Sequence, residues 1–523
     1  MCKGFVIGTM AFFLLLGTAY TATVYVPDNH STIQDAINAS VNGDTIIVRP
    51  GTYVENIFFL GKAITLRSEG GPLVTVIDGG NPLSADLASV VYFVSGEKRT
   101  TVLDGFTITN GKGTRDPNSP IDRRLGGGIC CSFSSPTILN NKVTANSVSG
   151  SSSLGGGVYC GPNCEPRVFN NTIAGNSGGS GGGIGVDTDG SWSPVISGNL
   201  IAQNTAIENG GGICSVSGEL IVDNNTIIQN SAEWTGGGIR CFHHLQTIAN
   251  NVVAGNHAGW GGGICLFFTP NNMITNNTIT GNTAVNRGGG LCCEIAGAWI
   301  TNTIFWNNTA AEGKEIYICG EPPLHQNLHI FSSDVEGGQA SIMVDTDATL
   351  HWGAGMIDLD PLFVDLPNGD CHLTAGSPCR DTGDNTAWGI LQTDFEGDPR
   401  ISTGTADMGA DEFYCHLYRA GDVIPGSLID IKVVGTPGFP ALLALGNGIQ
   451  DPPQFTPHGA LWLTMPLAKT WQLGAIPGTG VLSMPATIPS GWATGSEHPL
   501  QALVGPWGGG ATLLTNLTVL TVE

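Results

Sequence analysis

Arginine, histidine and carboxylate side chains come together in one short stretch of the chain. Glu233 and Trp234 begin the stretch, Arg240 lies within it, and His243 and His244 end it. An arginine beside a histidine can hold a carboxylate and move a proton, which is the chemistry needed to deprotonate a sugar acid. Arg240, His243 and Glu233 are therefore the candidates for catalysis. A solvated strand end explains the same residues, and we favour that interpretation.

Aromatic and charged residues also recur just before the glycine-rich segments of the chain. Aromatic rings and carboxylates along one edge suit carbohydrates, because rings stack on sugar faces and polar groups bond to hydroxyls. Surface turns also tolerate variation, so such residues can stand there without a ligand. The candidates for a binding edge are Glu208, Trp234, His257, Trp260 and Arg287.

Metal ligands are sparse in the sequence. Asp187-Thr188-Asp189-Gly190 resembles a fragment of a calcium loop but lacks the remaining ligands, so Asp187 and Asp189 are weak metal candidates. The cysteines contain no Cys-x-x-Cys pair, which gives little support to zinc. Ca²⁺ is the one cofactor that the sequence suggests, and none is firmly indicated.

A repeat of nearly constant period must position these residues. Gly-Gly-Gly followed by an aliphatic residue occurs seven times, at intervals of 25 to 29 residues. Self-similarity at such a period indicates one structural unit stacked on itself. The triplets begin at Gly126, Gly155, Gly181, Gly210, Gly236, Gly261 and Gly288.

Asparagines and short β-branched runs mark the rest of each unit. Segments this short, with Asn and Gly turns between them, are too brief for helices. We predict an all-β fold, a parallel β-helix with three strands per coil. Stacked Asn side chains should then hydrogen-bond from coil to coil at a spacing of about 4.8 Å. The recurring asparagines are Asn140-Asn141, Asn170-Asn171, Asn199, Asn224-Asn225, Asn250-Asn251, Asn276-Asn277 and Asn302.

The Gly-Gly-Gly-Ile and Phe/Ile-x-x-Asn-x-Ala marks resemble the repeats of chlamydial polymorphic outer-membrane proteins. More broadly, they resemble the right-handed parallel β-helix superfamily that includes pectate lyases. The resemblance covers residues 23–415 and implies the fold. That superfamily contains lyases, hydrolases, esterases, adhesins and tailspikes, so it does not imply one activity.

Cysteine positions follow the phase of the repeat. Counted from the last glycine of each triplet, residues one and three should point inward, and residue two outward. The third position holds Cys131, Cys160, Val186, Ser215, Cys241, Leu266 and Cys293. The outward position holds Cys130, Cys214, Cys265 and Cys292. The disulfide candidates for an exported protein are Cys160 with Cys164, Cys371 with Cys379, and Cys265 with Cys292.

Composition and the chain ends indicate where the protein acts. A basic start, a short apolar run and small residues through Ala22 predict a signal peptide at residues 1–22, and no later segment is apolar enough to span a membrane. The chain has 43 acidic and 20 basic residues and a formal net charge of −23, which argues against nucleic acid as a partner. We predict bacterial-type export, to the cell surface or the extracellular space.

Two further segments flank the repeats. A short amphipathic helix from Ile33 should cover the open N-terminal coil, because an uncovered end exposes strand edges and core. The β-helix is expected over residues 23–415. Residues 416–523 have few charges, many Gly and Pro and short apolar runs, which predicts a small C-terminal β-sandwich.

The function that the sequence favours is a secreted or cell-surface β-helix repeat protein without catalysis, which binds glycans or other surfaces. The alternative is a divergent Ca²⁺-dependent polysaccharide lyase or glycoside hydrolase. Convergence of Arg240, His243 and a carboxylate from a neighbouring coil would favour the enzyme. The sequence does not identify the glycan.

Overall fold

The computed structural model describes residues 21–413, with gaps at 83, 191, 270, 323, 367–368, 388–392, 396 and 402–403, and ten strands between residues 417 and 521. All but the last two residues of the predicted signal peptide lie outside the described residues, so that peptide stays a prediction. Within the described part of the chain, no helix has the length and apolar character that a bilayer crossing requires.

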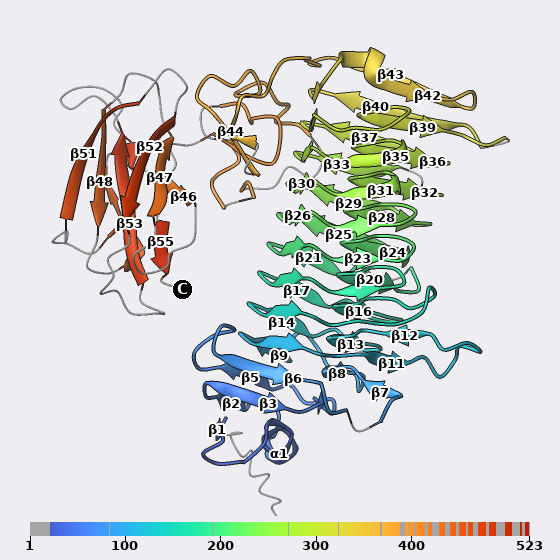
Figure 1. The fold of residues 1–523 in the computed structure, drawn as a ribbon, viewed down its shortest axis with the longest axis vertical. Coiled ribbons are helices and arrows are strands. Elements are labelled where there is room, and N and C mark those ends of the chain that lie inside the picture. The colour runs from blue at the N-terminus through green and yellow to red at the C-terminus, as the bar shows by residue number, and fades with distance from the viewer. Residues whose placement is uncertain are drawn as a thin grey trace, which may run out of the picture.

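Three long parallel sheets wind around one hydrophobic core, which confirms the predicted parallel β-helix (Figure 1). Each regular coil adds one strand to each sheet, and the three sheets have thirteen, eleven and eleven strands. Helix is scarce, with one α-helix, α1 (Ile33–Ala39), and one 3₁₀ turn, η1 (Gly338–Ser341), among the described residues.

Sheet A contains β1 (Thr23–Val26), β2 (Thr45–Val48), β5 (Thr65–Ser68), β9 (Val102–Asp104), β14 (Thr137–Leu139), β17 (Arg167–Phe169), β21 (Val195–Ser197), β25 (Leu220–Asp223), β29 (Gln246–Ala249), β33 (Asn272–Thr275), β37 (Ala298–Thr301), β40 (Gln326–Phe331) and β43 (Ala348–Trp352). Sheet B contains β3 (Gly51–Val54), β6 (Thr75–Asp78), β10 (Thr107–Thr109), β15 (Lys142–Thr144), β18 (Thr172–Ala174), β22 (Leu200–Ala202), β26 (Thr226–Ile228), β30 (Val252–Ala254), β34 (Thr278–Thr280), β38 (Ile304–Trp306) and β41 (Asp334–Val335).

In the regular coils, each strand of sheet C begins directly after a glycine triplet. It contains β4 (Ile57–Phe58), β8 (Val91–Phe93), β13 (Ile129–Cys131), β16 (Val158–Cys160), β20 (Ile184–Asp187), β24 (Ile213–Ser217), β28 (Ile239–Phe242), β32 (Ile264–Phe267), β36 (Leu291–Glu294), β39 (Ile316–Cys319) and β42 (Ile342–Val344).

Two smaller sheets form on the turns that lead into sheet C. The turn sheet is parallel and contains β19 (Ser177–Gly178), β23 (Thr205–Ala206), β27 (Ser231–Ala232), β31 (His257–Trp260) and β35 (Thr283–Arg287). An antiparallel sheet near the first triplet contains β7 (Leu87–Ala88), β11 (Gly113–Arg115) and β12 (Arg124–Leu125).

Buried asparagines tie each coil to the next, as the stacked positions predicted. In one ladder, Asn225 Nδ2 donates to Oδ1 of Asn251 at 3.0 Å and to the carbonyl oxygen of Ile196 at 2.8 Å. A second ladder follows sheet B, where Asn230 Nδ2 donates to Oδ1 of Asn256 at 3.0 Å. The residue before each asparagine of the first ladder, from Asn141 to Asn277, enters the left-handed region; it is an asparagine such as Asn224, with φ of 54°, except at Gly198.

The glycine triplets are required by the close approach of successive coils. The first glycine has a left-handed backbone, with φ of 67° at Gly236. A Cβ on the third glycine, Gly238, would stand 2.7 Å from the carbonyl oxygen of Gly263 in the next coil. The pattern ends at Gly313, where Lys314 and Glu315 replace the second and third glycines.

Helix α1 closes the N-terminal end, as expected. Ile33, Ala36 and Ile37 are buried in the core, and the Glu55 carboxylate accepts hydrogen bonds from the Ile33 and Gln34 amides at 2.9 and 3.0 Å. An acceptor at the first turn satisfies amides that have no partner within the helix.

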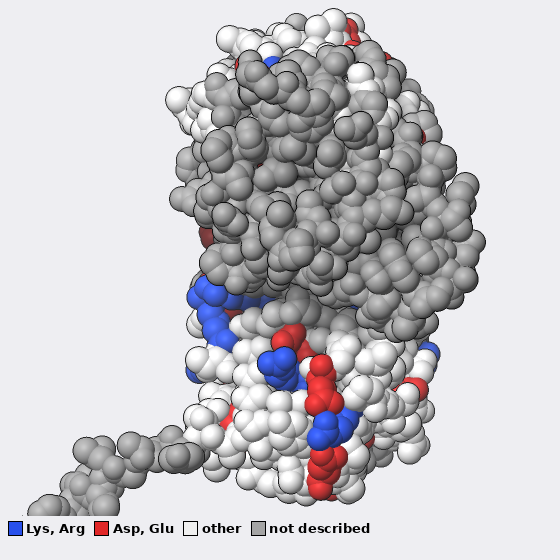
Figure 2. Space-filling model, turned by 90° about the vertical axis from the view of Figure 1, so that its left-hand side faces the viewer, with Lys and Arg blue, Asp and Glu red and all other residues white. Residues whose placement is uncertain are grey.

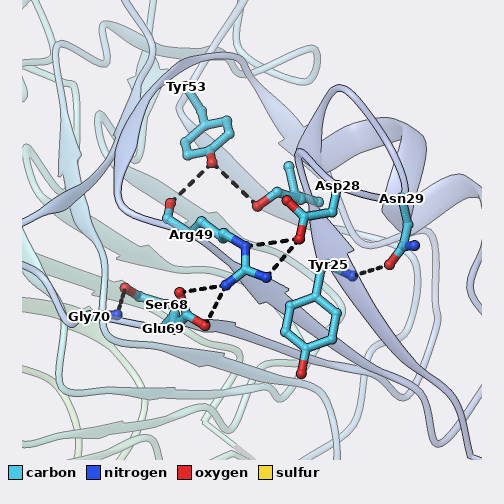
Figure 3. Close-up of polar contacts among 9 residues, drawn as sticks. Tyr25, Asp28, Asn29, Arg49, Tyr53, Ser68, Glu69 and Gly70 are labelled. Carbon is cyan, nitrogen blue, oxygen red and sulfur yellow. Dashed lines mark hydrogen bonds and ion pairs between the residues drawn. The ribbon is translucent and has the colours of Figure 1, made fainter.

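Arg49 links the first coils on the outside (Figure 3). Its Nε and Nη2 donate to Oδ2 of Asp28 at 2.9 and 2.7 Å, and its Nη1 donates to both oxygens of Glu69 at 2.8 and 3.0 Å. The hydrogen bond from Arg49 lowers the pKa of Asp28. Acidic and basic side chains alternate along the lower coils on the face shown in Figure 2. Because every guanidinium nitrogen is engaged, Arg49 is a structural link.

The described residues between Phe363 and Phe413 lie against the outer face of sheet B. Two antiparallel strands, β44 (Phe363–Asp365) and β45 (Asp370–Leu373), belong to this segment. The Ala410 amide donates to Oγ1 of Thr278 at 3.0 Å, and Met408 packs against Ile304. Because Val252 also packs against Cys371 and Ala410, the segment contacts three successive coils from the side.

The described strands beyond residue 416 pair in antiparallel sheets. They are β46 (Leu417–Ala420), β47 (Leu428–Val434), β48 (Pro440–Leu445), β49 (Ile449–Thr456), β50 (Gly459–Leu463), β51 (Lys469–Ala475), β52 (Val481–Thr487), β53 (Glu497–Val504), β54 (Leu513–Leu514) and β55 (Thr518–Thr521). The β-sandwich and the boundary near residue 415 stay predictions.

Candidate binding site beside sheet C

Strand alternation sets two columns of side chains on the outer face of sheet C. The predicted inward position is confirmed, because its six apolar residues belong to the main core and Ser215 is fully buried in the same register. The outward second position forms a column in which Arg240, Cys265, Cys292 and Tyr317 are paired in register. The outward fourth position forms the other column, which runs through Phe242, Phe267, Glu294 and Cys319.

The turn sheet supplies a wall beside these columns. Trp260, at the end of β31, is in register with Arg287, at the end of β35, and Arg287 is in register with Glu312. Trp260 also packs against the buried pair Cys265 and Cys292. The indole is therefore held by the sheet on one side and remains half-buried.

Arg287 is fixed by three neighbours. Its Nε lies 3.0 Å from Oε2 of Glu312, and its guanidinium lies over the rings of Trp260 and Tyr317 at 5.4 and 4.7 Å. The Tyr317 hydroxyl in turn donates to Oδ2 of Asp345 at 3.1 Å. Burial, with this hydrogen bond, raises the pKa of Tyr317, so the phenol stays neutral.

A recess of about 480 Å³ opens at this point of the wall. Its lining residues are Trp260, Asn286, Arg287, Ala311 and Glu312. The volume falls within the usual range of small-molecule sites, roughly 300–1,000 Å³. An indole, an amide and a paired guanidinium and carboxylate give the recess an apolar surface together with donors and acceptors.

Arg240 lies farther along the outer face and has different partners. Its guanidinium is 4.6 Å from the Phe242 ring centroid and 5.8 Å from that of Phe267. Its Nε is buried and has no hydrogen-bond partner within the described part of the chain. Burial raises the pKa of the Cys214 thiol, which the neighbouring Arg240 opposes.

The Glu294 carboxyl is close enough to both Arg240 and Arg287 to be affected by their charges. Burial raises its pKa, and Arg287 and then Arg240 oppose that shift. Sequence reasoning missed Glu294, although the repeat contained the signal. Glu294 occupies the outward fourth position, where the two preceding coils carry Phe242 and Phe267.

The predicted catalytic residues do not form one hydrogen-bonded group. His243 is exposed, with φ of 74°, and its ring lies 3.6 Å from that of Phe242. Glu233 is exposed on the turn before the triplet, away from the column that holds Arg240. No hydrogen bond joins Arg240, His243 and Glu233 among the described residues, and their catalytic role stays a prediction.

The predicted binding residues do follow one edge. The Trp234 amide donates to the Glu208 carbonyl oxygen at 2.9 Å, and the Trp260 amide donates to the Trp234 carbonyl oxygen at 2.8 Å. Trp234 is 59% exposed, and His257 is exposed on the same turn sheet. Of the five candidates, only Trp260 and Arg287 line the recess.

One of the two calcium candidates is paired with an arginine. Oδ2 of Asp187 lies 2.8 Å from Nη2 of Arg123. No group of three histidine, cysteine or carboxylate side chains suitable for a metal occurs among the residues that the structure describes. Calcium binding stays a prediction.

The twelve described cysteines are free thiols, so none of the three predicted disulfides is formed in this structure. Cys265 and Cys292 are paired in register, and the hydrogen bond between their thiols raises the pKa of Cys292. Cys160 and Cys164 share the main core. The third pair is separated, because Cys371 packs with Val252 and Ala410, whereas the Cys379 thiol lies 3.3 Å from Oδ2 of Asp334.

Comparison with known proteins supports the fold. The family model described as right-handed beta helix region matches residues 93–253. The match agrees with the three parallel sheets, and the chain folds as a right-handed parallel β-helix. The more specific likeness to chlamydial repeats stays a prediction. A comparison with curated proteins gives no match.

Two solved structures are similar in fold. One is XylC in complex with xylose, with 12% identity, a TM-score of 0.36, and coverage of 74% of this chain and 98% of that chain. Another is a pectin methylesterase in complex with a hexasaccharide, with 11% identity, a TM-score of 0.23, and coverage of 66% of this chain and 94% of that chain.

Proposed function

We propose that this chain is an exported, non-catalytic glycan-binding protein, and that the recess beside Trp260 is its binding site. The observation that carries the proposal is the composition of that recess. Trp260 offers an apolar ring, while Asn286 and the Arg287–Glu312 pair offer donors and acceptors. Sugars present apolar faces and a rim of hydroxyls, which such a mixed surface complements.

The state of Arg287 supports binding through hydroxyl groups. Its charge is balanced by Glu312 at 3.0 Å, and two aromatic rings limit its movement. A fixed guanidinium loses little side-chain entropy when it donates to a ligand. The Arg287–Glu312 pair is neutral as a unit, so it can bond to hydroxyls without requiring a charged sugar.

Titration of the full chain with a panel of neutral and acidic oligosaccharides tests the proposal. Trp260→Ala removes the ring from the recess, and the affinity for the bound glycan should fall about tenfold or more. Trp234→Ala is the matched control, because this exposed indole is one turn away and does not line the recess.

The control should bind like the wild-type chain. Equal losses in the Trp260 and Trp234 variants would place binding elsewhere on the edge. A panel in which no glycan binds the wild-type chain would overturn the proposal.

A polysaccharide lyase or glycoside hydrolase is the second candidate. Glu294 supports it, because a half-buried carboxyl with a raised pKa near Arg240 and Arg287 can hold a proton for transfer. Incubation with uronate polysaccharides and Ca²⁺ should then release unsaturated products or reducing ends. Glu294→Gln and Arg240→Ala should each abolish that release. A wild-type chain that leaves every polymer intact would exclude this candidate for those substrates.

A further inference from the structure

A second recess, of about 450 Å³, lies near the first glycine triplet. The antiparallel sheet β7-β11-β12 forms part of it, and the turn at Ser147 completes it. Its lining residues are Pro82, Ala85, Ala88, Lys112, Asp122, Arg124, Ser147 and Ser149. The recess is thus separate from the one at Trp260 and has different chemistry.

Two cationic side chains line this recess, and each keeps N–H groups that can donate to a ligand. Lys112 is exposed, and its Nζ lies 3.1 Å from Oγ of Ser147. It forms no ion pair within the described residues. Arg124 is anchored by Nη1, which donates to the carbonyl oxygens of Ala85 at 2.5 Å and Gly113 at 3.4 Å. Among the described residues, no hydrogen bond engages Nη2 of Arg124.

The charge in the recess contrasts with the rest of the chain. Acidic residues outnumber basic ones by 43 to 20, yet Asp122 is the only carboxylate lining this recess. Its Oδ1 lies 3.4 Å from Nε of Arg124, and its side chain is 62% exposed. Two cations against one largely solvated carboxylate leave the recess with a net positive charge, which favours an anionic ligand.

We propose that this recess binds a sulfate ester carried by a sugar. Lys112, Arg124 and the hydroxyls of Ser147 and Ser149 present donors from several directions. Such an arrangement suits the three terminal oxygens of a tetrahedral ester better than the two coplanar oxygens of a carboxylate. The inference stands on this recess alone and does not depend on the Trp260 site.

The remaining wall explains why the ester should be attached to a sugar ring. Pro82, Ala85 and Ala88 form an apolar surface beside the cations. A free inorganic anion would leave this surface in water, whereas the apolar face of a sugar ring would cover it.

Calorimetric titration of the full chain with a short sulfated oligosaccharide and its unsulfated counterpart tests this proposal. The sulfated form should bind at least about tenfold more tightly, and Lys112→Ala should remove about that factor. Lys142→Ala is the matched control, because this lysine is also exposed but lies outside the recess, on β15. Trp260→Ala should leave this affinity unchanged, which separates the result from the fate of the proposed function.

Each contrary outcome would overturn the proposal. If the wild-type and Lys112→Ala chains bound the sulfated oligosaccharide with equal affinity, Lys112 would not contribute to the site. Equal losses in the Lys112 and Lys142 variants would indicate general charge attraction. Inorganic sulfate that binds as tightly as the sulfated sugar would show an adventitious ion only, and tighter binding of a carboxylated sugar would assign a different anion.

Discussion

Arginine side chains in this chain differ in how many donors they leave for a ligand. Arg49 uses every guanidinium nitrogen on Asp28 and Glu69, so it links coils. Arg287 is held by one carboxylate and two rings beside an open recess. An arginine that is fixed but incompletely bonded is the better candidate for binding, because little entropy is lost when a ligand arrives.

The buried Glu315 side chain predicts how the stability of the folded chain depends on pH. Its side chain is buried at the third triplet position, and Asn308 Nδ2 donates to Oε2 at 2.6 Å. Burial raises its pKa from 4.5 to about 8, and the nearby Glu336 carboxylate adds to the shift. Between these values the folded chain keeps a proton that the unfolded chain has lost. The stability of the wild-type chain should therefore fall as the pH rises from 5 to 8.

Glu315→Gln should remove the part of that dependence that Glu315 contributes, because the amide is neutral and its oxygen can still accept from Asn308. The slope that is lost can reach about 1.4 kcal/mol per pH unit. Denaturant unfolding at pH 5, 6.5 and 8 measures it, with the exposed Glu219→Gln as control. An unchanged slope in Glu315→Gln would show that this carboxyl ionises in the folded chain without cost.

At the scale of elements, the asparagine ladders connect the strands of successive coils. Asn230 accepts from the Asn204 amide and from Asn204 Nδ2, both at 3.0 Å. It donates to the Ile201 carbonyl oxygen at 2.8 Å. Asn230→Ala should lower the free energy of unfolding by about 3 kcal/mol, because buried donors and an acceptor lose their partner.

Chemical denaturation of the folded chain measures this loss. Gln203→Ala is the control, since its side chain pairs with Gln229 in an exposed position, where water can replace the bond. A loss in the Asn230 variant no larger than in the control would mean that the buried ladder adds little to stability.

The period of the repeat explains which strands and side-chain orientations can be predicted from the sequence. The phase of the triplets correctly assigns inward residues such as Cys241 and outward residues such as Arg240, because strand alternation is strict. The same phase did not reveal the cover over sheet B. That cover joins Ala410 to Thr278, and contacts between such distant segments leave no periodic trace. For the same reason, the recess at Lys112 was not foreseen.

At the scale of the whole molecule, the two recesses belong to turns that lead into sheet C. Five triplet steps separate Gly126, beside the Arg124 recess, from Gly261, beside Trp260. At the strand spacing this is about 24 Å. A glycan of several sugar units can span that length, and engagement at both ends would raise its affinity through effective concentration.

The central claim is that the recess bounded by Trp260 and Arg287 holds a glycan, and a crystal structure of the full chain with its tightest-binding unsulfated oligosaccharide tests it most directly. We expect density for a sugar ring against the Trp260 indole, with hydroxyls within hydrogen-bond distance of Arg287, Glu312 or Asn286. A well-ordered sugar found elsewhere, with this recess empty, would contradict the claim.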